Sequence, residues 1–328
     1  MNPKFPLFFL FLTLIISVTF YNIQSIHASP FLNLTVTTDK PVYDPQEVVT
    51  IYGNLTQDEI PVLDGLVGIE VIDPKSQVLV IRTVRTGLVS PPVPYVRLFS
   101  VIPCNGSGGP KESFQRGEFA YFELTVKNFD SEPRTTLMTV NTYYSNNVPF
   151  CYGASKIDIE PGTIATAILC VPIPQDATLG DSKAYGNAYT DWPSAGGTPH
   201  CEEVSANFMI TDSGGGGISQ PTTSQVNGNY NTTFQLPPEK SGNYTVHATS
   251  DYQNEKIHQS TTFKINLPGD VNGDGMVFWQ DLLAVLLAYG SKEGDPTPPW
   301  DPRCDFNHDG MVFWQDLLVI LINYGKSV

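Results

Sequence analysis

Short runs of alternating hydrophobic and polar residues fill most of the chain between residues 31 and 266. Val67, Ile69 and Val71 are one example, with Gly68 and Glu70 between them. This period of two places every second side chain on one face of a strand. Gly and Pro, at 27 residues each, interrupt the runs at short intervals. The pattern therefore predicts a mainly β protein whose strands bury one face.

The period changes near the C-terminus, where two apolar stretches predict helices. The first covers Trp279–Tyr289 and is followed by Gly290, and the second covers Trp314–Tyr324 and is followed by Gly325. Glycine commonly ends a helix because it adopts positive φ without strain. Each helix carries two apolar stripes. The predicted inward stripes are Leu282, Val285 and Tyr289 in the first helix and Leu317, Ile320 and Tyr324 in the second.

The β pattern from residue 31 stops near Gly87, and a matching pattern begins again near Gly228. The stretches Thr38–Tyr43 and Val67–Val71 resemble a macroglobulin MG2 β-sandwich, whose usual continuation appears downstream in Gly228–Phe234. This resemblance implies one sandwich, from residues 29–87 and 225–267, with a second domain inserted in a loop, a position that tolerates insertion. Three consecutive small β units are the alternative.

The inserted region, residues 88–212, is also rich in strand patterns. It resembles the Ig-like, CARDB-type modules of prokaryotic surface proteins, without a sharp motif. Its aromatic residues are compatible with a sugar-stacking platform, although packing in the core is the more common use of such residues. The platform candidates are Tyr143, Tyr144, Tyr152, Tyr185, Tyr189 and Trp192.

A twelve-residue loop occurs twice near the C-terminus, starting at Asp270 and again at Asp305. The order of oxygen-bearing side chains matches an EF-hand loop, with side-chain ligands at positions 1, 3, 5 and 12, glycine at position 6 and a backbone carbonyl at position 7. We expect one Ca²⁺ in each loop, two ions in all. The predicted ligands are Asp270, Asn272, Asp274, Met276 and Asp281 in the first loop, and Asp305, Asn307, Asp309, Met311 and Asp316 in the second.

Two loop-then-helix repeats with Asp at position 12 resemble a type I dockerin module over residues 268–328. In that family, loop positions 10 and 11 and the following helix face bind a cohesin. The resemblance implies a partner surface here, although tryptophan replaces the smaller polar residues often found in dockerins. Self-association and docking onto the chain's own β domain are alternatives. The predicted partner-binding residues are Trp279, Gln280, Leu283, Leu286, Trp314, Gln315, Leu318 and Leu321.

The N-terminus predicts an export signal over residues 1–28. Lys4 precedes an apolar run from Leu7 to Phe20, which is shorter than a membrane span, and Ala28 fits a cleavage site. An uncleaved anchor is the alternative. Five glycosylation sequons agree with a secreted, extracellular or cell-surface protein. They begin at Asn33, Asn54, Asn105, Asn231 and Asn243.

Four cysteines in the inserted region predict two disulfides in an oxidising compartment. Of the three connectivities, we favour Cys151 with Cys170, which flank the turn signal Glu160–Thr163, and Cys104 with Cys201. Cys304 is left as a free thiol or an intermolecular link.

The formal net charge of −15 argues against nucleic acid as a partner, because phosphates are bound by Lys and Arg. The five histidines form no zinc or nucleophile motif, and no catalytic constellation is visible. They are His27, His200, His247, His258 and His308. We therefore expect no enzyme.

The predicted fold is a series of tandem or nested Ig-like β-sandwiches followed by a small α-helical, dockerin-like calcium-binding module. Residues 213–224 form a predicted Gly/Ser/Thr linker before the second part of the MG2-like sandwich. The predicted function is a secreted, non-catalytic surface or assembly protein that docks through calcium-dependent protein contact. The alternatives are a carbohydrate-binding component of an extracellular polysaccharide-degrading complex, and a purely structural role for calcium.

Overall fold

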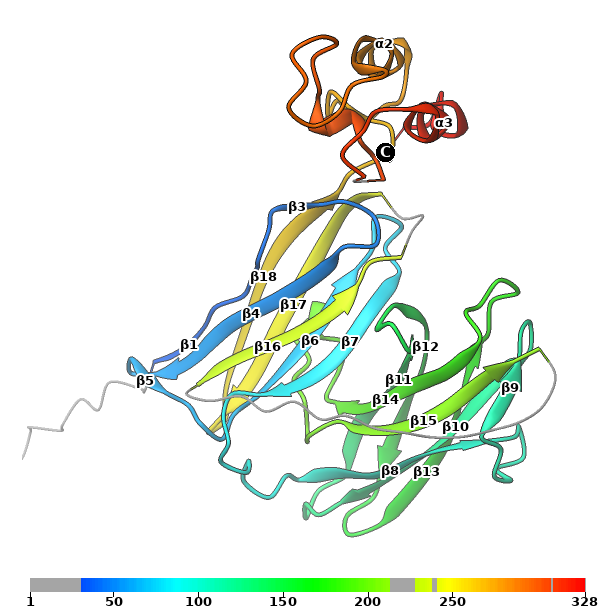
Figure 1. The fold of residues 1–328 in the computed structure, drawn as a ribbon. Helices are drawn as coiled ribbons and strands as arrows, with labels where there is room; N and C mark the ends of the chain where they lie inside the picture. Colours follow the sequence, from blue (N-terminus) through cyan, green and yellow to red (C-terminus); the bar gives the residue numbers. More distant parts are fainter. Residues whose placement is uncertain (1–30, 213–227, 238–240, 308, 328) are drawn as a thin grey trace, which may run out of the picture. The chain divides into compact units, whose positions relative to one another are not determined.

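The computed structural model describes residues 31–212, 228–237, 241–307 and 309–327. These residues form a mainly β protein with several sheets and two short C-terminal helices (Figure 1), which confirms the predicted fold class at this level. The predicted export signal and the predicted linker lie outside the described residues. Within the described ranges, no helix has the length and apolar character needed to span a bilayer.

Two facing sheets form what we call the first β unit (Figure 1). One sheet contains β1 (Leu32–Leu34), β2 (Thr37–Thr38), β4 (Val48–Gln57), β5 (Ile60–Pro61) and β16 (Asn229–Gln235). The other has the order β3 (Val42–Tyr43), β18 (Glu255–Ile265), β17 (Gly242–Tyr252), β6 (Leu66–Ile72) and β7 (Val78–Arg85). Alternate residues of both sheets, including Ile51, Val71 and Phe234, form one shared core.

Strands far apart in the sequence are neighbours in the first β unit. β16 is antiparallel to β4, with Thr232 opposite Ile51, and β17 is antiparallel to β6, with Val246 opposite Val71. Residues 229–265 therefore add strands to both sheets begun by residues 32–85.

The intervening chain forms the second β unit, which also has two sheets and its own core. The three-stranded sheet has the order β13 (Ile164–Pro172), β10 (Phe119–Asn128) and β8 (Val96–Cys104). The larger sheet has the order β12 (Pro149–Ile159), β11 (Arg134–Tyr144), β14 (Gly180–Tyr189), β15 (Val204–Thr211) and β9 (Ser113–Gln115). A short 3₁₀ helix, η1 (Pro193–Ala195), lies between β14 and β15.

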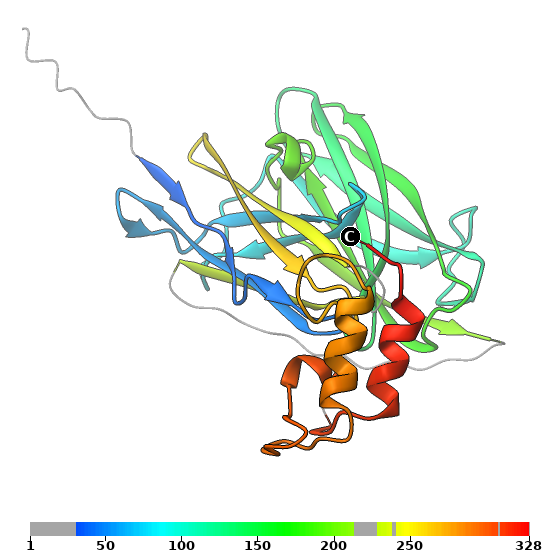
Figure 2. The same cartoon turned by 90° about the horizontal axis from the view of Figure 1, so that it is seen from above.

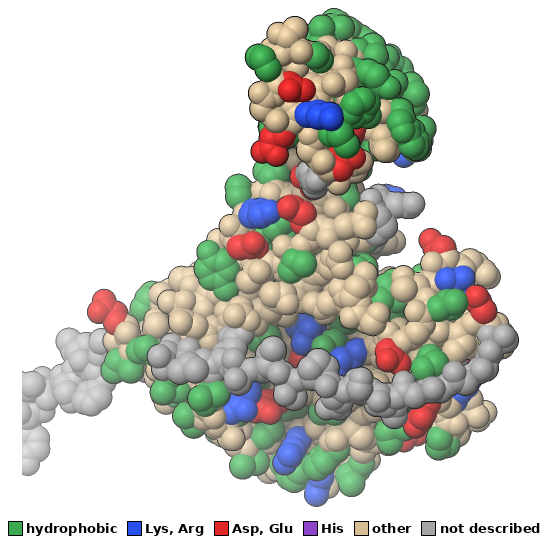
Figure 3. Space-filling model, viewed as in Figure 1, with side chains coloured by type: hydrophobic (Ala, Val, Ile, Leu, Met, Phe, Trp, Pro, Cys, Tyr) green, Lys and Arg blue, Asp and Glu red, His purple; other side chains and the backbone are tan. Residues whose placement is uncertain are grey.

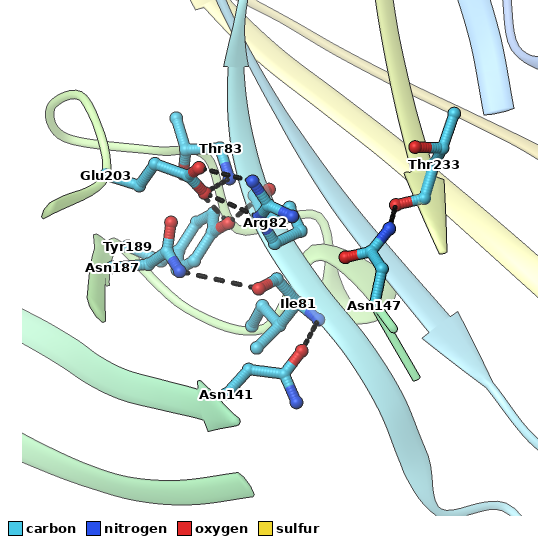
Figure 4. Close-up of polar contacts among 9 residues, drawn as sticks. All are labelled: Ile81, Arg82, Thr83, Asn141, Asn147, Asn187, Tyr189, Glu203 and Thr233. Carbon is cyan, nitrogen blue, oxygen red and sulfur yellow. Dashed lines mark hydrogen bonds and ion pairs between the residues drawn. The ribbon is translucent and has the colours of Figure 1, made fainter. Parts of the chain in front are cut away.

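Strand β7 is the edge of its sheet, and side chains of the second β unit bind its outer backbone groups (Figure 4). Asn141 Oδ1 accepts a hydrogen bond from Ile81 N at 3.1 Å, and Tyr189 Oη donates to the Arg82 carbonyl at 2.7 Å. Glu203 accepts from Thr83 N and forms an ion pair with the Arg82 guanidinium at 2.6 Å. These contacts satisfy an edge that would otherwise be open to pairing with another chain.

None of the five cysteines is part of a disulfide, so the predicted bridges are wrong in this structure. The turn at Glu160–Thr163 connects β12 and β13, which lie in different sheets, so no hairpin register places Cys151 opposite Cys170. Cys201 Sγ accepts from Leu98 N, whereas Cys104 is six residues further along β8. At about 3.3 Å per residue this separates Cys104 and Cys201 by roughly 20 Å, far beyond disulfide reach.

The C-terminal module, residues 267–327, contains α2 (Trp279–Ala288), the 3₁₀ helix η2 (Pro302–Cys304) and α3 (Trp314–Asn323) (Figure 2). The two helices end within one residue of the predicted bounds. A separate small core lies between them. It contains Leu267, Val271, Val277, Val285, Ala288, Cys304, Val312 and Ile320.

The two repeats of this module contact each other in equivalent ways. Gly290 N donates to Val312 O and Gly325 N donates to Val277 O, both at 2.8 Å. Tyr289 packs edge-on against Phe313 at a ring-centroid distance of 6.0 Å, and Tyr324 packs in the same way against Phe278 at 5.9 Å. Exchanged contacts of this kind are the signature of two-fold symmetry, here within one chain.

Candidate functional site

Asp270 organises the first loop, residues 270–281, through hydrogen bonds to backbone amides. Its Oδ1 accepts from Gly273 N at 2.8 Å and from Asp274 N at 3.1 Å, and its Oδ2 accepts from Gly275 N at 2.8 Å. Gly275 has a φ of 85°, which a residue with a Cβ rarely adopts. The sharp turn expected at position 6 is therefore present.

Asp281, the predicted ligand at position 12, is only 1% exposed and lies in the first turn of α2. Its Oδ1 accepts from Val271 N and its Oδ2 accepts from Phe278 N, each at 2.9 Å. A carboxylate at a helix N-terminus also interacts favourably with the helix dipole. Asp281 therefore ties both ends of the loop to the start of the helix.

The second loop, residues 305–316, repeats these contacts atom for atom where it is described. Asp305 Oδ2 accepts from Gly310 N at 2.9 Å, and Gly310 has a φ of 79°. Asp316, also 1% exposed, accepts from Phe306 N at 2.8 Å and from Phe313 N at 2.9 Å. The loops are thus two copies of one geometry.

The remaining predicted ligands lie on the open side of each loop. Asn272 Nδ2 donates to Asp274 Oδ2 at 3.0 Å, and Asn307 donates to Asp309 in the same way at 2.9 Å. Met276 N donates to Asp274 Oδ1 and Met311 N donates to Asp309 Oδ1. The structure therefore connects positions 1, 3 and 5 of each loop by hydrogen bonds.

The donor set of each loop fits Ca²⁺ in type and order, because it offers carboxylate and amide oxygens around a glycine turn. Among the described residues, however, the His, Cys, Asp and Glu side chains form no group of three or more placed to hold a metal ion. The carboxylates point instead at backbone amides. Binding of calcium would require Asp270, Asp274 and Asp281 to turn their oxygens toward one point.

The predicted partner-binding side chains are largely exposed. Trp279 is 60% and Trp314 is 62% exposed, and the leucines that follow them on each helix are also open to solvent. These leucines are Leu283, Leu286, Leu318 and Leu321. Gln280 is exposed and Gln315 is half-buried. Hydrophobic side chains gather on this part of the C-terminal module in Figure 3.

The exposed apolar faces are wider than the sequence pattern predicted. Leu287 and Ile322, which follow the second predicted leucine of each helix, are 65% and 63% exposed. Tyr289 and Tyr324 were expected on the inward stripes but are also exposed, because each lies past the end of its helix and packs on a loop phenylalanine of the other repeat. Val285 and Ile320 are buried as predicted.

The aromatic residues considered for a sugar platform do not form one. Tyr143 and Tyr189 are fully buried, and Tyr185 packs edge-on against Tyr143 and lies under the Arg82 guanidinium at 3.6 Å. Tyr144 stacks on Phe150, and Tyr152 meets Trp192 edge-on. These side chains serve packing and the contact between the two β units.

Comparison with known proteins gives distant structural similarity only. No family model and no curated protein matches the chain. A Paenibacillus cycloisomaltooligosaccharide glucanotransferase is similar over 35% of this chain and 14% of its own, with 13% identity and a TM-score of 0.28. The C-terminal domain of wzt is similar over 40% of this chain and 86% of its own, with 12% identity and a TM-score of 0.32.

A Listeria innocua β-glucosidase with bound glucose has 11% identity and a TM-score of 0.25, covering 35% of this chain and 15% of its own. This chain thus spans a small part of the two enzymes. Scores at this level carry no conclusion about function.

Proposed function

We propose that the chain is an exported, non-catalytic surface or assembly protein whose C-terminal module binds two calcium ions and docks a partner protein. The observation that carries this proposal is the doubled loop geometry, in which Asp270 and Asp281 are matched by Asp305 and Asp316. A single acidic turn arises easily, whereas two copies with the same contacts and the same following helix indicate one structural unit used twice, which supports the proposal.

Calcium would act on the loops through charge. Each loop contains three aspartates, and within the described residues none of them forms an ion pair with Lys, Arg or His. Carboxylates that converge without a cation repel each other, so a bound ion of charge +2 stabilises the converged arrangement. The exposed helix faces begin two residues before Asp281 and Asp316, so ordering of the loops also orders the docking surface.

The docking surface consists of Trp279, Leu283 and Leu286 on α2 and their counterparts Trp314, Leu318 and Leu321 on α3. Large apolar side chains that remain open to solvent on neighbouring positions are typical of protein interaction sites, and tryptophan is a frequent anchor. The module resembles a type I dockerin, which favours a cohesin-like or other surface protein as partner. Self-association is the alternative.

The β units would act as spacers that carry this module. The resemblances to an MG2-like sandwich and to an inserted Ig-like domain predict a nested arrangement, and the pairing of β16 with β4 and of β17 with β6 supports it. The proposed boundaries are residues 29–87 with 225–267 for the outer domain and 88–212 for the insert.

Calorimetric titration of the full chain with Ca²⁺ tests the metal step. We expect two bound ions, both lost in Asp281→Asn/Asp316→Asn, because the amide keeps the size of the side chain and loses the charged bidentate oxygen pair. Asp301→Asn is the control, since its carboxylate binds Arg303 outside the loops and should not affect calcium. An unchanged titration in the double variant would reject the calcium proposal.

Glycan binding is a second candidate, supported by the outer face of the three-stranded sheet. Phe99, Ile102 and Ile168 are exposed there, and Tyr95 and Phe129 continue the apolar surface beyond the strands. Aromatic side chains open to solvent provide flat faces for sugar rings. Affinity electrophoresis on a panel of polysaccharides tests it, with Phe99→Ala expected to abolish any retardation and Tyr52→Ala, exposed on β4 of the first β unit, as the control.

A further inference from the structure

Two histidines that are eleven residues apart in the sequence meet on the outer face of the first β unit. His247 lies on β17 and His258 on β18, which pair as an antiparallel hairpin. His247 Nδ1 and His258 Nε2 are 3.0 Å apart, and the ring centroids are 5.3 Å apart. No other pair of imidazoles is in contact among the described residues.

The hairpin places this pair by its register. Gln253 and Asn254 form a two-residue turn in which both have positive φ, 53° and 66°, as the tightest hairpins require. With this turn, His247 faces Ser260 and His258 faces Thr249, so the two rings are diagonal neighbours on one face. The opposite face carries the core residues Val246 and Phe263, which prevents the strand from slipping by one residue.

We propose that His247 and His258 form a binding site for a first-row transition-metal ion such as Zn²⁺ or Cu²⁺. Imidazole nitrogen is a preferred ligand of both ions, and each binds at about 2.0–2.1 Å. Two such bonds at angles between a right angle and a tetrahedral angle place the nitrogens about 2.9–3.3 Å apart. The observed separation of 3.0 Å meets this requirement without movement of either strand.

The surroundings suit a metal ion with open coordination positions. His258 is exposed and His247 is half-buried, so water reaches the pair and can complete the shell. Glu70 lies opposite His247 on β6, but its Oε2 accepts a hydrogen bond from Ser194 N at 2.7 Å, so the two imidazoles are the proposed protein ligands.

This site differs in chemistry from the two C-terminal loops. The loops offer oxygen ligands, which suit Ca²⁺, whereas the histidine pair offers nitrogen, which suits Zn²⁺ and Cu²⁺. The two kinds of site can therefore be measured independently in the same chain.

The test uses the full chain without an affinity tag, titrated with Zn²⁺ by calorimetry and with Cu²⁺ by electron paramagnetic resonance. We expect one ion per chain at this site, with two nitrogens in the Cu²⁺ spectrum. His247→Gln and His258→Gln should each weaken binding at least about tenfold, because loss of even an outer-shell partner costs 10–100-fold. Lys256→Gln, on the same face of β18, should retain the ion, as should Asp281→Asn/Asp316→Asn.

Thermal unfolding without metal shows whether the variants fold, and the exposed position of His258 predicts that His258→Gln keeps the midpoint of the parent chain. If the parent chain and both folded histidine variants bind Zn²⁺ and Cu²⁺ equally, the pair is only a hydrogen bond between two rings and the proposal is wrong. A Cu²⁺ spectrum without nitrogen ligands would overturn it as well.

Discussion

At the scale of single residues, the Arg82–Glu203 ion pair is the contact between the two β units whose disruption should cost the most stability. Both side chains are more than four-fifths buried, and Arg82 also lies on the ring of Tyr185. Glu203→Gln leaves the buried guanidinium without its counter-charge, so we expect urea unfolding to show a loss of about 3 kcal/mol. Glu202→Gln is the matched control, since its pair with Arg85 is exposed and should cost under about 1 kcal/mol. Equal losses in the two variants would contradict this reasoning.

The stability of the folded chain should also depend on pH through His200. Burial, together with the positive charges of Arg134 and Lys256, lowers the pKa of His200 to about 4. The unfolded chain takes up this proton near pH 6.5 and the folded chain only near pH 4. The contribution of His200 to the free energy of unfolding is therefore fully present above pH 6.5. It falls by up to about 3 kcal/mol as the pH is lowered from 6.5 to 4. We expect His200→Gln to flatten the stability profile between these pH values, as measured by urea unfolding. The same slope in parent and variant would show that other groups cause it.

At the scale of the elements, α3 carries a buried residue and an exposed residue at adjacent positions. Ile320 is fully buried in the core of the C-terminal module, whereas Leu321 is 56% exposed. Ile320→Ala should destabilise the module by about 2–5 kcal/mol, and Leu321→Ala by less than about 0.5 kcal/mol. Tryptophan fluorescence during thermal unfolding reports this module when both variants are made in a Trp192→Phe chain, because the other three tryptophans lie within residues 267–327. A large loss from Leu321→Ala would mean that its side chain packs within the chain.

The helices and many strands could be predicted because each follows a local period. The pairing of the strands that carry Cys151 and Cys170 could not be predicted. The turn sequence at Glu160–Thr163 is the same whether the following strand pairs with the preceding one or crosses to another sheet. The His247–His258 pair depends on the register of one turn, and Gln253–Asn254 lacks the glycine that usually marks such turns. The order of oxygen-bearing side chains in the two loops was visible in the sequence, whereas the buried state of Asp281 and Asp316 depends on packing in the folded module.

At the scale of the whole molecule, the ends of the second β unit return to one place in the first. The Thr86 hydroxyl donates a hydrogen bond to the Val62 carbonyl, and Thr86 N donates one to the Gly65 carbonyl. On the other side, Gly228 O accepts from Leu55 N. The chain therefore leaves and re-enters the first β unit beside the segment 55–65, as expected where one folded unit is inserted into another.

This geometry predicts that the insertion can be removed. A chain in which residues 88–227 are replaced by a short Gly/Ser linker keeps every strand of the first β unit, including β16, β17 and β18. We expect it to fold, with β-sheet circular dichroism and a cooperative thermal transition, and with a lower midpoint because the polar edge of β7 loses Asn141, Tyr189 and Glu203 as partners. Deletion of residues 228–265 is the matched comparison, and it should unfold the first β unit because Val49, Ile51 and Val71 lose the facing strands that bury them. If the excised chain is unfolded and the truncated chain is not, the two β units do not fold separately and the nested arrangement is wrong.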